Sequence, residues 1–369
     1  MKLDVEPTPG APVVGTEEGA PAGRRRRTLR RVALAAVSVG IVAAVFVYFL
    51  PTVANYADVW DVVRQLSWPW VAALAAATVL NLATFAPPWQ IALPGLSFIR
   101  AMELTQASTA LSIVVPGGPA AGAAGAYGML RQWGVATRDF SRAVTLTSLW
   151  NQFVNLSYPI VAVFLLTLTG EQTAALATVA FVGVAVLGVV VTTFVVVLVS
   201  NRVARDIGDA VARLVSWARG KLRRGPVSWD GGSFERFRRD AGDFLERRWH
   251  LLTLASFGGS LTVFLLFVVS LRALDVPASQ VSLAEAFAAW ALVRILGAIP
   301  ITPGGLGVVE LGLTGALVGF GGSNAAVVAA VLVYRFLTIV PTLVLGLIAA
   351  FTFRRHRPAA SVVAPGGSG

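Results

Sequence analysis

Helix breakers and a carboxylate interrupt a long apolar run near the C-terminal end, at Ile299-Pro-Ile-Thr-Pro-Gly-Gly-Leu-Gly-Val-Val-Glu310. Thr302 is a good helix N-cap, and Pro303 at the first helical position loses no donor that a helix needs. The free N–H groups that follow belong to Gly304 and Gly305, so no side chain shields them from a ligand. Since a helix N-terminus has a partial positive charge, the stretch predicts a helix start that offers a site for an anion, most often a phosphate.

A similar Pro-Gly-Gly element lies in the first half of the chain, at Pro116, Gly117 and Gly118. It offers a second helix start of the same kind, without the threonine cap. The alternative is that these glycines only let helices pack closely, because Gly118 and Gly122 have the small-xxx-small spacing of tight helix pairs. Close packing accounts for this element better than for the one at Pro303.

Three charged residues in the predicted spans add to the hypothesis of a binding site: Arg294, Glu310 and Arg335. A charge at the bilayer centre costs about 2.5–3.5 kcal/mol on insertion scales, so its presence there indicates a function. Glu310 could pair with either arginine and leave the other to hold an anionic group; a structural clasp between helices is the alternative. The candidate substrate-binding residues are Arg294, Thr302, Pro303, Gly304, Gly305, Glu310, Arg335, Pro116, Gly117 and Gly118.

The sequence offers no constellation for catalysis or for a metal ion. It has no cysteine, and its two histidines, His250 and His356, lie in basic segments. No nucleophile–base pair, metal cluster or nucleotide-binding loop is found, so we expect neither enzyme activity nor a cofactor. Four amides in predicted spans are weaker signals, because a single amide often forms only an interhelical hydrogen bond: Asn81, Asn151, Gln152 and Asn155.

The elements that position these residues belong to a polytopic membrane protein. Of the 369 residues, 56% are hydrophobic and only 13% charged, whereas roughly a quarter of the residues in a soluble chain are charged. Several windows reach the roughly twenty apolar residues that span a bilayer. The net charge of +11 comes from arginines beside these spans, which indicates contact with anionic inner-leaflet headgroups and argues against nucleic acid.

Hydropathy predicts an all-α fold with about six full spans, near residues 32–50, 68–93, 143–168, 174–200, 251–271 and 325–353. Two further apolar stretches, Glu103–Leu130 and Ala284–Phe320, are each broken by a Pro-Gly-Gly element. The break favours a re-entrant hairpin of two half-helices; for the first stretch, one complete span is the alternative. The pattern of span, broken hairpin and span therefore occurs twice in opposite orientation, as an inverted repeat whose site lies where the breaks meet.

The chain is expected to form one transmembrane domain, residues 24–353, between cytoplasmic tails at 1–23 and 354–369, the first of them disordered. Arg24–Arg27 precede the first span, so the positive-inside rule places the N-terminus in the cytoplasm. The Arg-rich, Lys-poor composition favours a bacterial plasma membrane. Residues 201–250 form a basic cytoplasmic segment, either an amphipathic helix on the inner leaflet or a solvated loop with helical pieces.

The segment from Leu292 to Gly321, with Pro303-Gly-Gly-Leu-Gly-Val-Val-Glu310 inside it, resembles the lysylphosphatidylglycerol synthase transmembrane (flippase-like) family. Val331-Leu-Val-Tyr-Arg335 is similar to that family's closing signature. The resemblance extends from Arg31 to Phe353. Members of the family include the flippase half of the multiple peptide resistance factor, which moves aminoacylated phosphatidylglycerol between leaflets. Others are stand-alone proteins, some of them associated with glycolipid, hopanoid or cell-envelope glycan pathways.

Two departures limit what this resemblance implies. The family's first Pro-Gly element is commonly followed by a Glu and an Arg, whereas residues 120–124 here are alanines and a glycine. The first half is therefore expected to contribute only backbone to a site. The aminoacyl-transferring activity of the family resides in a separate soluble domain, which no segment here resembles.

The resemblance and the broken helices together predict a flippase-like transporter that binds or moves an anionic lipid or a lipid-linked cell-envelope precursor. The alternative is a non-transporting membrane partner or scaffold for an enzyme of envelope lipid or glycan biosynthesis. Such a partner would need no accessible polar cavity. Close packing of the two Pro-Gly-Gly turns, without space for water or a ligand, would therefore favour it.

Overall fold

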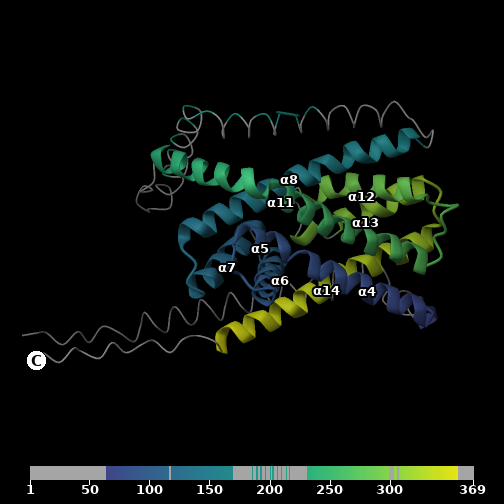
Figure 1. Cartoon of the computed structure of the whole chain (residues 1–369). Helices are drawn as coiled ribbons and strands as arrows, with labels where there is room; N and C mark the ends of the chain where they lie inside the picture. Colours follow the sequence, from purple (N-terminus) through teal and green to yellow (C-terminus); the bar gives the residue numbers. More distant parts are fainter. Residues whose placement is uncertain are drawn as a thin grey trace, which may run out of the picture.

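The computed structural model describes residues 64–115, 118–168, 231–298, 303–305 and 307–355, together with isolated positions between 185 and 216. Within this part of the chain every regular element is a helix (Figure 1). Some predicted features lie outside the described residues: the first span at 32–50, most of the span at 174–200, both tails, and the site candidates Thr302, Pro116 and Gly117.

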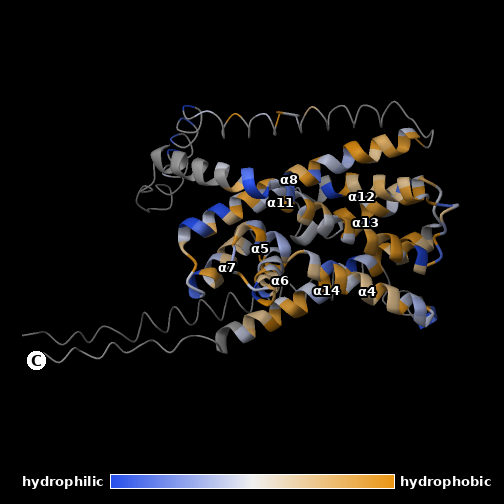
Figure 2. Cartoon of the chain, viewed as in Figure 1, coloured by the Kyte–Doolittle hydropathy of each residue, from blue (hydrophilic) through white to orange (hydrophobic). Residues whose placement is uncertain are grey.

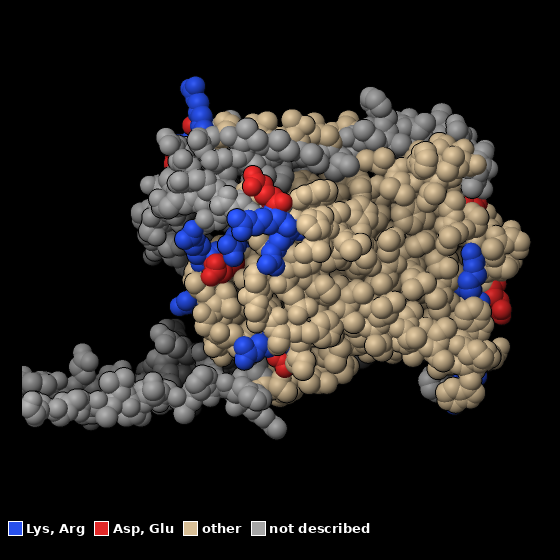
Figure 3. Space-filling view, viewed as in Figure 1, with Lys and Arg blue, Asp and Glu red and all other residues tan. Residues whose placement is uncertain are grey.

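Four helical segments are long and apolar enough to cross a membrane, and they correspond to four of the predicted spans. They are Trp68–Ala92, Thr137–Leu168, Glu246–Ala273 and Ala325–Thr352. Their hydrophobic residues give the molecule an apolar middle (Figure 2). On the face in Figure 3, charged side chains gather toward the two ends, and a wide band between them has none. The prediction of an all-α membrane protein is therefore confirmed.

The first described span is broken near its C-terminal end, between α4 (Trp68–Thr84) and α5 (Pro87–Ala92). Pro87 and Pro88 open the second piece, and a proline has no N–H to donate to the preceding turn. One carbonyl beside the break, that of Phe85, accepts a hydrogen bond from the Thr105 hydroxyl at 3.4 Å. The break is thus tied to the next helix along the chain.

Two shorter helices, α6 (Phe98–Val114) and α7 (Gly118–Gln132), follow and pack along each other. The packing is close at Gly122, where a Cβ atom would collide with the Ser112 hydroxyl and lie 2.5 Å from the Ser108 carbonyl oxygen. In lipid, helix pairs are held largely by such van der Waals contact between small residues. The predicted packing role of the glycines in this stretch is confirmed at Gly122.

A second short pair is formed by α12 (Leu283–Ala298) and α13 (Val308–Gly319), which contact each other. The 3₁₀ turn η2 (Pro303–Gly305) lies between them. A capping box starts α12: the Ser282 N–H donates to Glu285 at 2.7 Å, and the Glu285 N–H donates to the Ser282 hydroxyl at 3.2 Å.

Each short pair packs against a long helix from the other half of the chain. The first pair contacts α14 (Asn324–Arg355) through α6, and the second contacts α8 (Thr137–Leu168) through α12. The main core fills the space among these helices and α11 (Gly231–Ala273), with large aromatic members at Tyr158, Phe267, Phe287 and Trp290.

The boundary at His250 between the basic segment and the next span is not a helix boundary. The 43 residues of α11 run through it, with Glu246 and Arg247 exposed just before it. No proline lies within α11 to end a helix there. The polar residues 231–250 and the apolar span are therefore one continuous helix.

Candidate functional site

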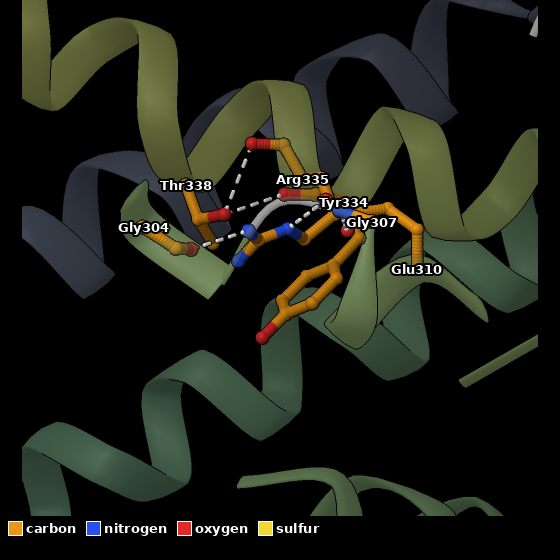
Figure 4. A network of polar contacts seen from close by, with 6 residues as sticks. All are labelled: Gly304, Gly307, Glu310, Tyr334, Arg335 and Thr338. Carbon is orange, nitrogen blue, oxygen red and sulfur yellow. Dashed lines mark hydrogen bonds and ion pairs between the residues drawn. The ribbon is translucent and has the colours of Figure 1, made fainter. Parts of the chain in front are cut away.

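Glu310 and Arg335 form a buried ion pair between α13 and α14 (Figure 4). The Arg335 Nε atom lies 2.6 Å from the Glu310 Oε1 atom, and the two side chains are 14% and 6% exposed. Arg335 also donates from Nη2 to the Gly304 carbonyl oxygen at 2.8 Å, while Glu310 Oε2 accepts the Gly307 N–H at 2.6 Å. The pair therefore holds the turn at η2 in place and leaves neither charge uncompensated.

The helix after the Pro-Gly-Gly element begins later than its sequence predicts. Its N-cap is Gly307 and its first residue is Val308, so the predicted start at Pro303 is wrong. The reason is backbone geometry, because Gly304, Gly305 and Gly307 have φ values of +63°, +68° and +83°. Such left-handed residues cannot belong to a right-handed α-helix.

The carboxylate of Glu310 occupies the position at a helix start where the sequence predicted a bound ligand anion. It accepts the N–H of the N-cap residue of α13, at the positive end of that helix. The candidates Pro303, Gly304 and Gly305 form the turn beside it, and Gly305 is buried. A ligand anion would therefore have to displace Glu310 to reach the start of α13.

Residues next to the two Pro-Gly-Gly elements lie side by side. A Cβ atom at Gly304 would be 3.2 Å from Cγ2 of Ile113, which belongs to the last turn of α6, three residues before Pro116. η2 contacts both α6 and α12. Gly118, the remaining candidate of the first element, starts α7 with a φ of +41°.

Arg294 on α12 is in a different situation from Arg335. Its Nε and Nη2 atoms donate to Asn155 Oδ1 on α8, at 3.2 and 2.7 Å. Its guanidinium carbon lies 4.8 Å from the ring centroid of Trp290 and 5.9 Å from that of Tyr158. Among the described residues, no carboxylate forms an ion pair with it. Arg294 is thus a partly buried cation whose acceptor is a neutral amide.

The aromatic neighbours of Arg294 are not among the site residues predicted from the sequence. Trp290 precedes Arg294 by four residues and Tyr158 follows Asn155 by three, spacings that place side chains on one helix face. Tyr334 lies near both arginines, and its ring stacks edge-on against Phe267 at 5.1 Å. The sequence contains these spacings, but they indicate a shared cluster only once α8 and α12 are known to be neighbours.

The remaining amides have separate roles. Asn81 on α4 donates to the Thr262 hydroxyl on α11 at 3.3 Å, an interhelical hydrogen bond of the kind expected as the alternative. Asn151 and Gln152 on α8 are exposed. Within the described residues there is no group of three His, Cys, Asp or Glu side chains that could hold a metal ion.

The family described as Lysylphosphatidylglycerol synthase TM region matches residues 33–346 of the chain. The match includes both short helix pairs and the three charged residues Arg294, Glu310 and Arg335. No curated protein sequence matches the chain.

Proposed function

The chain belongs to the lysylphosphatidylglycerol synthase TM region family, and from this premise we propose that it is a flippase-like protein of the bacterial plasma membrane. In this proposal it binds an anionic lipid or a lipid-linked cell-envelope precursor and moves it between leaflets. Both termini face the cytoplasm, and the protein has no catalytic step of its own.

The observation that carries the proposal is that Arg294 forms no ion pair with a carboxylate among the described residues. A cation in the middle of a membrane protein is expensive and normally pairs with an acid. Glu310 satisfies Arg335, so Arg294 has only Asn155 as an acceptor among the described residues. An anionic headgroup would supply the missing charge, and the acyl chains would stay in lipid.

The arrangement of the short helices supports a transporter with an inverted repeat. The helices α6, α7, α12 and α13 have 17, 15, 16 and 12 residues. At 1.5 Å per residue they are roughly 18–26 Å long, less than the 30 Å of a bilayer core. Each therefore suits a half-helix of a re-entrant hairpin, as in transporters whose substrate site lies where broken helices meet.

The long helices match each other across the proposed repeat. α8 and α14 both have 32 residues and one internal proline, Pro159 and Pro341. α8 packs on the second short pair and α14 on the first. Movement of one half against the other would expose Arg294 to one leaflet and then to the other.

A second candidate is a non-transporting partner or scaffold for an envelope-biosynthesis enzyme. Its support is the packing at η2, where Gly304 lies against the apolar Ile113 side chain and Glu310 closes the start of α13. A static scaffold would have a turn that is packed closely in this way, without space for a ligand. The scaffold candidate gives no account of the uncompensated Arg294.

Lipid movement in reconstituted vesicles tests the proposal. Purified protein is inserted into vesicles that contain a fluorescent phosphatidylglycerol analogue, and the fraction that a membrane-impermeant quencher reaches is followed in time. We expect faster exchange between leaflets than in protein-free vesicles, and loss of that gain in Arg294→Gln. Arg247→Gln, at an exposed position on α11, is the matched control. Exchange no faster than in protein-free vesicles would favour the scaffold.

A further inference from the structure

In the described part of the chain, four buried side-chain polar atoms form no hydrogen bond of good geometry: Arg142 Nε and three atoms in the core. The three in the core are Tyr158 Oη, Ser260 Oγ and Trp290 Nε1. Each of these residues is 1% exposed. A buried polar group without a partner costs free energy, so native structures keep few of them, and each requires an explanation. The three core atoms come from α8, α11 and α12.

The three residues gather around Arg294. The rings of Tyr158 and Trp290 lie 5.0 Å apart, centroid to centroid, and the guanidinium of Arg294 is within 6 Å of both. The Ser260 hydroxyl lies near enough to the Tyr158 hydroxyl, and the Tyr334 hydroxyl near enough to the Trp290 N–H, for weak hydrogen bonds. Arg294, which pairs with no described carboxylate, and the three core atoms therefore belong to one cluster, and Tyr334 lies between this cluster and the Glu310–Arg335 pair.

The chemistry of this cluster selects an oxyanion. A guanidinium has five N–H donors, an indole has one N–H, and each hydroxyl adds a donor. Asn155 Oδ1 accepts from only two of the guanidinium nitrogens. Donors are therefore in excess, and no carboxylate among the described residues pairs with Arg294 to receive a ligand amine. A phosphate group has enough acceptor oxygens to satisfy several of these donors at once, whereas a carboxylate has two.

A polar stripe on α8 connects the cluster to the surface. Asn151, Asn155 and Tyr158 are spaced by four and three residues, so they lie along one helix face. Asn151 is exposed, Asn155 is partly buried and Tyr158 is buried. The stripe therefore places two amides between the exposed face of α8 and the buried cluster.

We propose that Tyr158, Ser260 and Trp290 complete, with Arg294 and Asn155, a binding site for the phosphate group of a lipid headgroup. This inference deepens the proposed function and rests on it for the source of the phosphate. It assigns recognition to the phosphate, which many lipids share, and the rest of the headgroup faces away from the donors.

Binding measurements on the full chain test the site. The wild type and Tyr158→Phe are purified in detergent and titrated with short-chain phosphatidylglycerol, with diacylglycerol hemisuccinate as an anionic lipid without phosphate, and with inorganic phosphate. We expect the wild type to bind phosphatidylglycerol at least tenfold more tightly than the hemisuccinate lipid. Tyr158→Phe should weaken phosphatidylglycerol binding about tenfold, as loss of one hydrogen bond to a charged group would.

Two further variants distinguish a role in lipid binding from a structural role. Tyr127→Phe removes the hydroxyl of an exposed tyrosine that contacts Thr137, and it should bind as the wild type does. Ser260→Ala removes a hydroxyl that forms no hydrogen bond of good geometry with little change of volume, and it should weaken phosphatidylglycerol binding without lowering the melting temperature of the lipid-free protein. A structural role for these hydroxyls would change the melting temperature instead of the lipid affinity.

Some outcomes would overturn the site. Wild-type affinity in both Tyr158→Phe and Ser260→Ala would do so, as would equal affinity for the two lipids. Binding of inorganic phosphate without phosphatidylglycerol would overturn the assignment to a lipid.

The binding and lipid-movement measurements distinguish an error in the binding site from an error in the proposed function. If Tyr158→Phe binds and moves lipid normally while Arg294→Gln does not move it, the site is wrong and the proposed function is retained. If the wild type moves no lipid but binds phosphatidylglycerol through Tyr158, the site is retained and the proposed function is wrong.

Discussion

Arg335 and Arg294 are two cations in the same apolar interior, and only Arg335 has an acidic partner among the described residues. Arg335 has a carboxylate partner at 2.6 Å and a backbone carbonyl at 2.8 Å. Arg294 has an amide oxygen, two aromatic faces and, in its cluster, three polar atoms without a hydrogen bond of good geometry. The first environment is complete without a ligand and holds a backbone turn. Among the described residues no anion faces the second, so we propose a structural role for Arg335 and a binding role for Arg294.

The largest effect is expected for Glu310→Gln. The change leaves Arg335 buried without its counter-charge, and loss of one member of a buried pair costs about 3–5 kcal/mol. We expect a clear drop in melting temperature in detergent, although the glutamine keeps the shape of the side chain.

A double variant serves as the control for this experiment. Glu310→Gln with Arg335→Met removes both charges and should recover much of the lost stability. If Glu310→Gln has the melting temperature of the wild type, the clasp contributes little and the contrast between the two arginines is wrong.

A smaller loss is expected for Gly304→Ala, which tests the turn that the clasp holds. A non-glycine residue with left-handed φ costs roughly 1–2 kcal/mol, and the new methyl group would also meet Ile113 at 3.2 Å. Gly134→Ala is the matched control, because Gly134 has a φ of +82° and nothing within 4 Å of its would-be Cβ. Thermal unfolding should show the larger loss at Gly304. Equal losses would mean that Ile113 yields freely and that the two breaks are not tightly joined.

A still smaller change in stability is expected for Arg294→Gln. The variant loses hydrogen bonds to Asn155, worth about 1 kcal/mol net, but it also removes a charge that no described carboxylate balances. The melting temperature should therefore stay near that of the wild type. A loss as large as that of Glu310→Gln would show that Arg294 has an acidic partner and is a second clasp.

The prediction about topology involves no loss of stability. If the first short pair opens to the cytoplasm and the second to the outside, their ends should be labelled from opposite sides. The chain has no cysteine, and Gln132 and Ser323 are both exposed at such ends. A membrane-impermeant thiol reagent should label Ser323→Cys in intact cells and Gln132→Cys only after lysis. Labelling of both in intact cells would contradict the re-entrant hairpins.

Local patterns predicted much of the fold. Apolar runs indicated the four spans that the structure describes, and the Pro-Gly-Gly elements marked the places where helices stop. The start of α13 was missed, because the favourable cap at Thr302 has less weight than three glycines with positive φ, at positions 304, 305 and 307, whose φ values a sequence does not show.

The candidate site was predicted in part. The sequence indicated the three charged residues but could not choose the partner of Glu310, since that choice depends on the relative rotation of α12 and α14. The cluster of Tyr158, Ser260 and Trp290 could not be predicted, because it forms only where three helices meet.

Lipid movement by the Arg294 variants tests the central claim most directly, because that claim assigns Arg294 to an anionic headgroup. The exchange rate of fluorescent phosphatidylglycerol is measured in vesicles with the wild type, Arg294→Gln and Arg294→Lys, all at equal amounts of folded protein. We predict a loss of at least tenfold for Arg294→Gln at an unchanged melting temperature, and a partial recovery for Arg294→Lys, which keeps the charge but not the planar donors. Exchange by Arg294→Gln at the wild-type rate would contradict the account.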